Sequence, residues 1–206
     1  ALLDRMLRLT GYFSALAGTL FWVWGRPLAQ LLYHSAEAGF YLETLAPAMP
    51  LMYLESMVDG AMKGVGEQKA SFRYSVWDSM LRIGGVAVLL PRYGMRGFLA
   101  VILASSLYTC TANTGRLLFS SGTKHAFRRW LGAPTLAAFG AAAAGVGLRR
   151  ILAGYMEQSA LRQLGSLAAG GAATAAVFLL AALPLGLGEE LQEIFRCHFI
   201  QSVRKT

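Results

Sequence analysis

Two pairs of ionisable residues lie inside segments of the sequence that are otherwise apolar. Glu55 and Asp59 are four residues apart, and Asp78 and Arg82 repeat that spacing in the next apolar segment. Residues four apart share one face of a helix, so the two members of each pair are expected to act together. In a bilayer each such charge costs about 2.5–3.5 kcal/mol on insertion scales. Their presence therefore indicates a specific role for these two segments.

Glu55 and Asp59 have two interpretations. In the functional one, the carboxylates line a water-filled cavity and bind a proton or a sodium ion. In the structural one, Lys63 neutralises an inward-facing pair near the cytoplasmic surface, which suits Asp59 better because Lys63 lies one turn away. Gly60 and Gly64 follow on the same helix at a spacing that would allow a neighbouring helix to approach closely.

Asp78 and Arg82 also have two interpretations. The structural one is an internal ion pair that cancels most of the cost of burial, and the spacing favours it. In the functional one, Arg82 binds an anionic phosphate part of the time, because the planar guanidinium donates two hydrogen bonds at once, and Asp78 holds it otherwise. The next apolar segment has a polar half, interpreted as interhelical hydrogen bonds rather than a substrate site: Ser105, Ser106, Thr109, Thr111, Asn113 and Thr114.

Composition places the chain among membrane proteins. Hydrophobic residues make up 55% of the sequence and charged residues 15%, whereas soluble domains carry about 25% charge. The formal net charge of +8 does not indicate nucleic-acid binding, because the basic residues cluster between long apolar runs, as charges that flank membrane spans do. No basic helix and no basic patch interleaved with aromatic residues is present, so no nucleic-acid partner is expected.

The sequence holds no pattern typical of an enzyme or a metal site. The two cysteines, Cys110 and Cys197, form no framework, and the histidines His34, His125 and His198 lack ligand spacing. There is no nucleophile–base pair and no phosphate-binding glycine loop. We therefore expect no catalytic residue, no metal and no cofactor, apart from coupling to a proton or a sodium ion.

Apolar runs predict an all-α membrane protein with about six transmembrane helices, since about 20 apolar residues cross a bilayer. The expected spans cover about 9–25, 39–63, 72–90 and 97–115 in a first part, 1–120, and about 130–148 and 164–187 in a second part, 121–187. Residues 188–206 are expected to form an amphipathic helix on the cytoplasmic membrane surface, or a solvated helix.

Prolines divide this pattern further. Pro27, after Arg26, is expected to end the first helix, with an interfacial loop or short amphipathic turn over 27–38. Pro47 and Pro50 lie in the second span and release backbone carbonyls that need partners. Glu43, near the outer end of that span, is expected to be solvated.

Lysine and arginine placement predicts a multi-pass protein of the cell membrane with both ends of this segment in the cytoplasm. The cytoplasmic side then receives Arg5, Arg8, Lys63, Lys69, Arg73, Arg116, Lys124, Arg128, Arg129, Arg196, Arg204 and Lys205. The outer side receives Arg26, Arg92, Arg96, Arg149, Arg150 and Arg162. Because the chain starts at Ala1 and its first apolar run is too long for a signal peptide, we expect it to be a fragment or the C-terminal part of a longer protein.

A family resemblance extends from Tyr41 to Leu118. It is carried by YLETLAPAMPLMYLESMVDGAMKGVGEQKASFRYSVWDSMLRI, followed by PRYGMRGF. These runs resemble the C-terminal half of the polysaccharide-type flippases of the multidrug/oligosaccharidyl-lipid/polysaccharide exporter superfamily. Within that superfamily the likeness is greatest to the stage V sporulation protein B group of Gram-positive bacteria. The turn from Gly60 to Gly66 and the loop from Pro91 to Gly97 match the family pattern.

The resemblance implies an architecture and a function. Such proteins have two pseudo-symmetric six-helix bundles, often with two extra C-terminal helices, and this chain would supply the last four helices of the second bundle and the extra pair. They move undecaprenyl-linked saccharides across the cytoplasmic membrane by alternating access, for peptidoglycan, spore cortex or capsule. Glu55 and Arg82 would then face the central cavity. The implied partners are membrane lipid, the lipid-linked saccharide and the missing N-terminal lobe.

Two other functions remain open, because likeness of fold does not fix the substrate. The first is a cation-coupled multidrug antiporter of the same superfamily, for which carboxylates should dominate the cavity. A pyrophosphate-linked sugar should instead require arginine, and this segment holds both. The second is a membrane scaffold that transports nothing.

Overall fold

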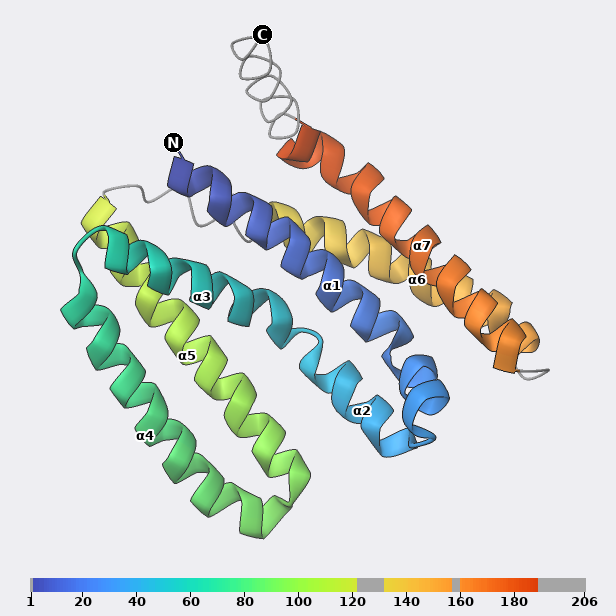
Figure 1. Ribbon diagram of the computed structural model, residues 1–206, viewed down its shortest axis with the longest axis horizontal. Helices are drawn as coiled ribbons and strands as arrows, with labels where there is room; N and C mark the ends of the chain where they lie inside the picture. The colour runs from blue at the N-terminus through green and yellow to red at the C-terminus, as the bar shows by residue number, and fades with distance from the viewer. Residues whose placement is uncertain (1, 122–131, 157–159, 189–206) are drawn as a thin grey trace, which may run out of the picture.

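The computed structural model describes residues 2–121, 132–156 and 160–188, and every regular element in these ranges is a helix. The expected all-α class is therefore confirmed for this part of the chain (Figure 1). The helices are α1 (Leu2–Tyr33), α2 (Ala36–Leu45), α3 (Ala48–Gly64), α4 (Gln68–Tyr93), α5 (Met95–Ser121), α6 (Ala133–Met156) and α7 (Ala160–Ala182), which ends in the π-helical turn η2 (Leu183–Leu187).

Helix α1 lies at the centre of the arrangement and packs against α2, α3, α6 and α7. The hairpin of α4 and α5 lies on one side of it, and the hairpin of α6 and α7 lies on the other (Figure 1). Helix α5 packs extensively against both α3 and α4. Helices α3 and α4 diverge from the short turn that joins them, so α5 is the element that positions the polar side chains of both.

Glycines permit the two tight turns of this region. Gly66, between α3 and α4, and Gly94, between α4 and α5, have φ angles of 85° and 59°, which side chains with a β-carbon rarely adopt. Gly97 follows the second turn, where a β-carbon would collide with the backbone carbonyl of Leu89. The α4–α5 hairpin can therefore close only with a glycine at position 97.

Helix α1 does not end at Pro27, so the expected loop over 27–38 is wrong for most of its length: α1 runs to Tyr33 and α2 begins at Ala36. Proline has no N–H to donate to the carbonyl four residues earlier, which is that of Val23. The guanidinium of Arg149, in α6, donates a hydrogen bond to this oxygen over 3.0 Å. Since this carbonyl has a replacement partner, the helix passes the proline.

The expected second span over 39–63 is divided into α2 and α3. Pro47 lies at the break, and the Ala46 carbonyl, which Pro50 cannot serve, accepts a bond from the Met49 amide at 3.2 Å. Glu43 is not simply solvated, because its carboxylate forms an ion pair with Arg26 of α1. This pair ties α2 to the end of the central helix.

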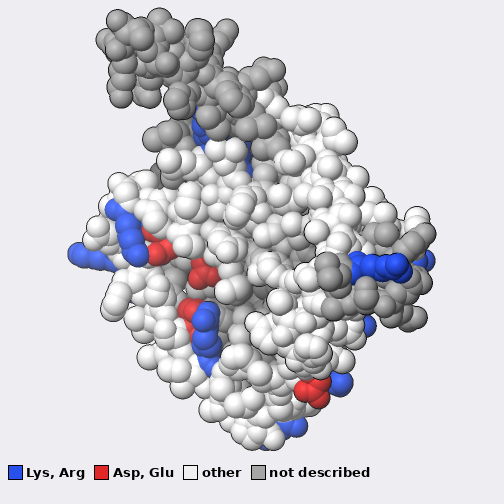
Figure 2. Space-filling view, turned by 45° about the vertical axis from the view of Figure 1, so that its right-hand side comes forward, with Lys and Arg blue, Asp and Glu red and all other residues white. Residues whose placement is uncertain are grey.

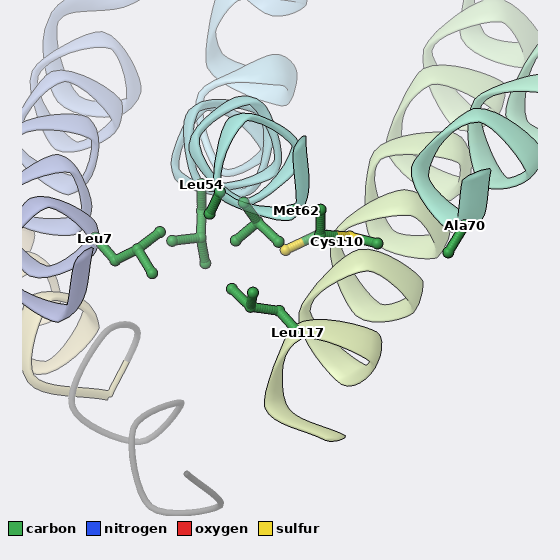
Figure 3. Packing of buried hydrophobic residues seen from close by; sticks show 8 residues of the cluster. Leu7, Leu54, Met62, Ala70, Cys110 and Leu117 are labelled. Carbon is green, nitrogen blue, oxygen red and sulfur yellow. The ribbon is translucent and has the colours of Figure 1, made fainter. Parts of the chain in front are cut away.

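Buried side chains form clusters on both sides of α1. On the side of the first hairpin, Leu7 meets Leu54 and Met62 of α3 and Leu117 of α5 (Figure 3). On the other side, small residues of α6 pack against Phe178 of α7 and against α1. These clusters determine which face of each helix is buried and which face is left for other contacts.

Close helix contacts occur at glycines other than those expected. Gly60 and Gly64 have no neighbouring atom within 4 Å of a β-carbon position, so the predicted close approach there is wrong. Gly18 of α1 instead lies against the Ala46 carbonyl, at 2.9 Å from a β-carbon position. Gly170 of α7 lies directly against the ring of Trp24. The α3 glycines face away from the helices that pack on α3.

Two helices are long and apolar enough to cross a membrane, Met95–Leu117 and Arg162–Leu185. The other spans of the expected six are not established by this test. Helices α2 and α3, with 10 and 17 residues, are shorter than the roughly 20 residues of a full crossing. Helices α1, α4 and α6 are long enough, but their described residues include no stretch that is sufficiently apolar. Membrane association is thus indicated, and the number of passes stays a prediction. The expected tail helix over 189–206 lies outside the described residues.

The contact between Arg149 and Val23 leads to a stability prediction. Arg149→Met should destabilise the protein by about 1.5–3 kcal/mol, the range for a hydrogen bond from a charged group. In a Pro27→Ala background the loss should be smaller, because an alanine amide restores the bond to the Val23 carbonyl. Thermal melts of the four variants in detergent would measure this, with Arg150→Met, at the exposed neighbouring position, as the control. Equal losses in both backgrounds would contradict the explanation.

Candidate functional site

The four candidate residues lie along the faces where α3, α4 and α5 meet, in a row that we call the polar seam. It consists of Glu55 and Asp59 from α3, Ser71, Asp78 and Arg82 from α4, and Ser105 and Thr109 from α5. Figure 2 shows acidic and basic side chains close together on the left part of an otherwise largely uncharged face. The seam brings the four candidates into one region, though they are joined in separate groups.

The central group joins α4 to α5 through three polar side chains. Arg82 Nη2 lies 3.0 Å from Asp78 Oδ2, so the expected ion pair is confirmed. The same guanidinium donates to Ser105 Oγ from Nη2 at 2.9 Å and from Nε at 3.2 Å. The Ser105 hydroxyl, which is fully buried, donates to the other oxygen of Asp78. Each member of this triad is therefore held by the other two.

The triad uses the Nε and Nη2 atoms of the Arg82 guanidinium and leaves Nη1. Its Nε and Nη2 atoms face Ser105 and Asp78, and the side chain remains 47% exposed. Among the described residues no hydrogen bond involves Nη1, whose two N–H groups can still donate. Arg82 is thus fixed in direction and keeps donors for an anion.

Asp59 belongs to a second group, near the end of α3. Its carboxylate lies 2.7 Å from Lys63 Nζ and accepts a hydrogen bond from the Ser71 hydroxyl of α4. Both interactions satisfy the carboxylate within the fold. The contact with Lys63 is the one that the spacing predicted, and it supports a structural role for Asp59.

Glu55 has a different environment from the other acids. It is half-buried and lies near the Thr109 hydroxyl of α5. Asp78, Arg82 and Asp59 act on it electrostatically, but among the described ion pairs none includes Glu55. It is the candidate acid with no dedicated base.

The sequence reasoning missed a further ion pair. Arg116 of α5 and Glu67, in the turn before α4, form a two-pronged contact with oxygen–nitrogen distances of 3.0–3.3 Å. Thr109 follows Ser105 by four residues and Arg116 follows Thr109 by seven, so the three share one face of α5, and this spacing was a usable signal. The pair anchors the third helix of the seam at the turn.

In these ion pairs the base is more exposed than the acid. Arg82 is 47% exposed against 13% for Asp78, and Lys63 is 59% exposed against 26% for Asp59. Long basic side chains reach outward while their apolar stems cover the helix surface. Each pair therefore presents its positive end to the surroundings.

Other features of the described residues add no ligand site. No three His, Cys, Asp or Glu side chains there are grouped so that they could hold a metal ion. The buried oxygens Asn113 Oδ1 and Thr114 Oγ1 on α5 have no hydrogen-bond partner. A pocket of about 230 Å³ lies away from the seam, between α1, the α2–α3 break and α6, and its lining is almost wholly apolar.

Comparison with known proteins gives no relative from which a role could be transferred: no family model, curated protein or solved structure matches the chain. The site must therefore be judged on its own residues.

The triad gives a second stability prediction. Arg82→Leu leaves the Asp78 carboxylate, only 13% exposed, without its base, so we expect a loss of about 1–3 kcal/mol, less than for a fully buried pair because Arg82 is half exposed. Asp78→Asn should recover part of this loss in the double variant. Thermal melts in detergent would measure it, with Arg92→Leu, at an exposed position of the same helix, as the control. A double variant no better than Arg82→Leu would show that the carboxylate is not the cause.

Proposed function

We propose that this chain is part of a membrane transporter that flips a lipid-linked saccharide, such as an undecaprenyl-linked peptidoglycan or polysaccharide precursor, by alternating access. One observation carries the proposal: Arg82 lies in α4, a helix whose outer face is largely apolar, is held by Asp78 and Ser105, and keeps its Nη1 donors free. An ionisable group that is fixed within an apolar segment marks a substrate or ion path by default.

The outer faces of α4 support a place in the membrane. This helix contacts its neighbours along a narrow stripe, and large apolar side chains cover much of the rest. The exposed ones include Phe72, Trp77, Met80, Ile83 and Val88. Such a surface is unfavourable in water and suits lipid or a second lobe. Asp78 and Arg82 are both bonded to Ser105 of α5, so this pair is linked to a neighbouring helix, as a bilayer would require.

Arginine suits the proposed substrate chemically. A lipid-linked sugar is joined to its carrier through a pyrophosphate, and a guanidinium donates paired hydrogen bonds to phosphate oxygens. In the proposed complex the two N–H groups of Nη1, which Asp78 and Ser105 leave free, donate to the pyrophosphate. Asp78 and Ser105 keep the guanidinium oriented while the substrate enters and leaves.

Glu55 favours a second candidate, a cation-coupled multidrug antiporter. Its carboxyl has no dedicated base and lies half-buried beside Thr109, which suits a group that takes up and releases a proton or a sodium ion. The two functions share this site and differ in cargo. An antiporter would depend on Glu55 and not on the free edge of Arg82.

The position of α4 in the membrane can be tested with one outward substitution. Ile83→Arg places a charge on the exposed apolar face, where Ile83 is 71% exposed, and should lower insertion by about 2.5–3.5 kcal/mol if this face contacts lipid. The measurement is the fraction of the chain that resists alkaline carbonate extraction of membranes. Val65→Arg, in the exposed turn between α3 and α4, is the matched control and should have no effect. Equal extraction of both variants would place α4 outside the lipid.

The cargo can be tested with a flipping assay on the full product of the coding region. Arg82→Ala should reduce the rate at which lipid-linked sugar crosses a vesicle membrane by at least about tenfold, the effect of about 1.4 kcal/mol of lost binding. Glu55→Gln should lower the rate and abolish its dependence on the ion gradient. If Arg82→Ala flips at the wild-type rate while Glu55→Gln stops export of a cationic drug, the antiporter is the better assignment. Wild-type rates in both variants would remove both residues from the site.

A further inference from the structure

The outer face of α4 changes from basic to aromatic to apolar along its length. Lys69 and Arg73, in the first two turns, are exposed. Trp77 follows at 62% exposure, and Met80 and Val88 lie further along the helix at 60% and 52%. Successive members of this row are three, four or eight residues apart, so they share one side of the helix. The two charges therefore lie at one end of a face whose remainder is apolar.

This order matches the layers of a bilayer surface. An α-helix rises about 1.5 Å per residue, so Arg73 lies about 6 Å from Trp77 along α4, and Val88 lies about 16 Å beyond Trp77 on the other side. Tryptophan favours the headgroup level, and half of the hydrocarbon core is about 15 Å thick. With Trp77 at that level and α4 across the membrane, Lys69 and Arg73 reach the lipid phosphates and Val88 lies near the bilayer centre.

A groove between α4 and α5 begins beside Trp77. It has a volume of about 370 Å³ and an almost wholly apolar surface, and its lining consists of Trp77, Met80 and Leu81 of α4 and Tyr108 of α5. An apolar cavity of about 150 Å³ is enough to hold benzene. The groove therefore has room for part of an acyl chain, and Arg73 lies one helical turn from it on the headgroup side.

The charges beside the groove differ from other bases of the region. Lys63, Arg82 and Arg116 each contact a carboxylate. Within the part of the chain that the structure describes, Lys69 and Arg73 take part in no ion pair and no side-chain hydrogen bond. They can therefore bind an anionic phosphate without giving up a contact within the protein.

We propose that the groove between α4 and α5 binds an anionic phospholipid, with an acyl chain beside Trp77 and Tyr108 and the phosphate on Lys69 and Arg73. A row of cations that leads into an aromatic ring and an apolar groove is complementary to an anionic headgroup and its acyl chain. The cytoplasmic leaflet carries the negative surface potential of anionic lipids, and these cations are predicted to lie on that side. The proposal rests on the proposed position of α4 in the membrane and does not depend on the cargo.

The test is the quenching of Trp77 fluorescence by phospholipids that carry bromine on their acyl chains. The full product of the coding region is placed in nanodiscs of unbrominated phosphatidylcholine, and the Trp77 signal is the difference between wild type and Trp77→Phe. Brominated phosphatidylglycerol should quench this signal at a mole fraction at least about fivefold lower than brominated phosphatidylcholine with the same chains, because one basic side chain near a membrane surface adds about that factor. Lys69→Gln/Arg73→Gln should bring the ratio close to one.

Arg92→Gln/Arg96→Gln is the matched control. It removes the same charge from exposed positions at the other end of the α4–α5 hairpin, and it should keep the wild-type ratio. Excess unbrominated phosphatidylglycerol should restore the fluorescence, whereas glycerol phosphate, the headgroup without its chains, should not. If glycerol phosphate alone removes the preference, the cations bind free phosphate and the lipid assignment is overturned.

The other outcomes separate the site from the position of α4. Equal quenching by the two brominated lipids in wild type would overturn the anionic site, although α4 would still contact lipid. The same ratio in Lys69→Gln/Arg73→Gln as in wild type, or an equal loss in the control, would show that these two cations do not hold the headgroup. No quenching by either lipid would mean that protein or water covers this face, and would overturn the site together with the membrane position of α4. None of these results bears on Arg82, whose anion the flipping assay tests.

Discussion

The contact among Asp78, Arg82 and Ser105 is the interaction on which the polar region of this protein depends. Helix α4 has a narrow packed stripe, and the triad lies in the middle of it. Without the buried hydroxyl of α5, the carboxylate and the guanidinium would satisfy only each other. With it, an ion pair on one helix becomes a link between two helices. The direction of Arg82, and hence any use of its free edge, follows from that link.

The same rule, that a polar group in an apolar helix needs a partner from another helix, organises the far side of the molecule. Arg149 of α6 serves the Val23 carbonyl that Pro27 cannot serve. The indole of Trp24 donates to Thr174 of α7 over 3.1 Å, in a space that Gly170 leaves open. The α6–α7 hairpin is therefore joined to α1 by polar contacts as well as by apolar packing.

The sequence predicted what depends on neighbours along one helix. The spacing of Asp78 and Arg82 predicted their ion pair, and the apolar runs predicted an all-α fold, because both follow from helical periodicity. Helical periodicity does not predict contacts between segments that are far apart in the sequence. Ser105 is 23 residues from Arg82, and Arg149 is 126 residues from Val23. Predictions from the local sequence also failed at two kinds of position. The helix end predicted at Pro27 is wrong because Arg149 bonds to the Val23 carbonyl. The close helix approach predicted at Gly60 is wrong because no neighbouring helix packs there. Whether the helices cross a membrane six times depends on surroundings that neither spacing nor packing contains.

In the ion pairs of the polar seam the acid lies inward and the base lies outward. The surface along the seam therefore presents positive charge, although each pair is neutral as a whole. Each pair is neutral, yet its more exposed member is the cation, at Lys63 and at Arg82. An anion that approached either pair from outside would therefore meet the exposed cation before the acid behind it.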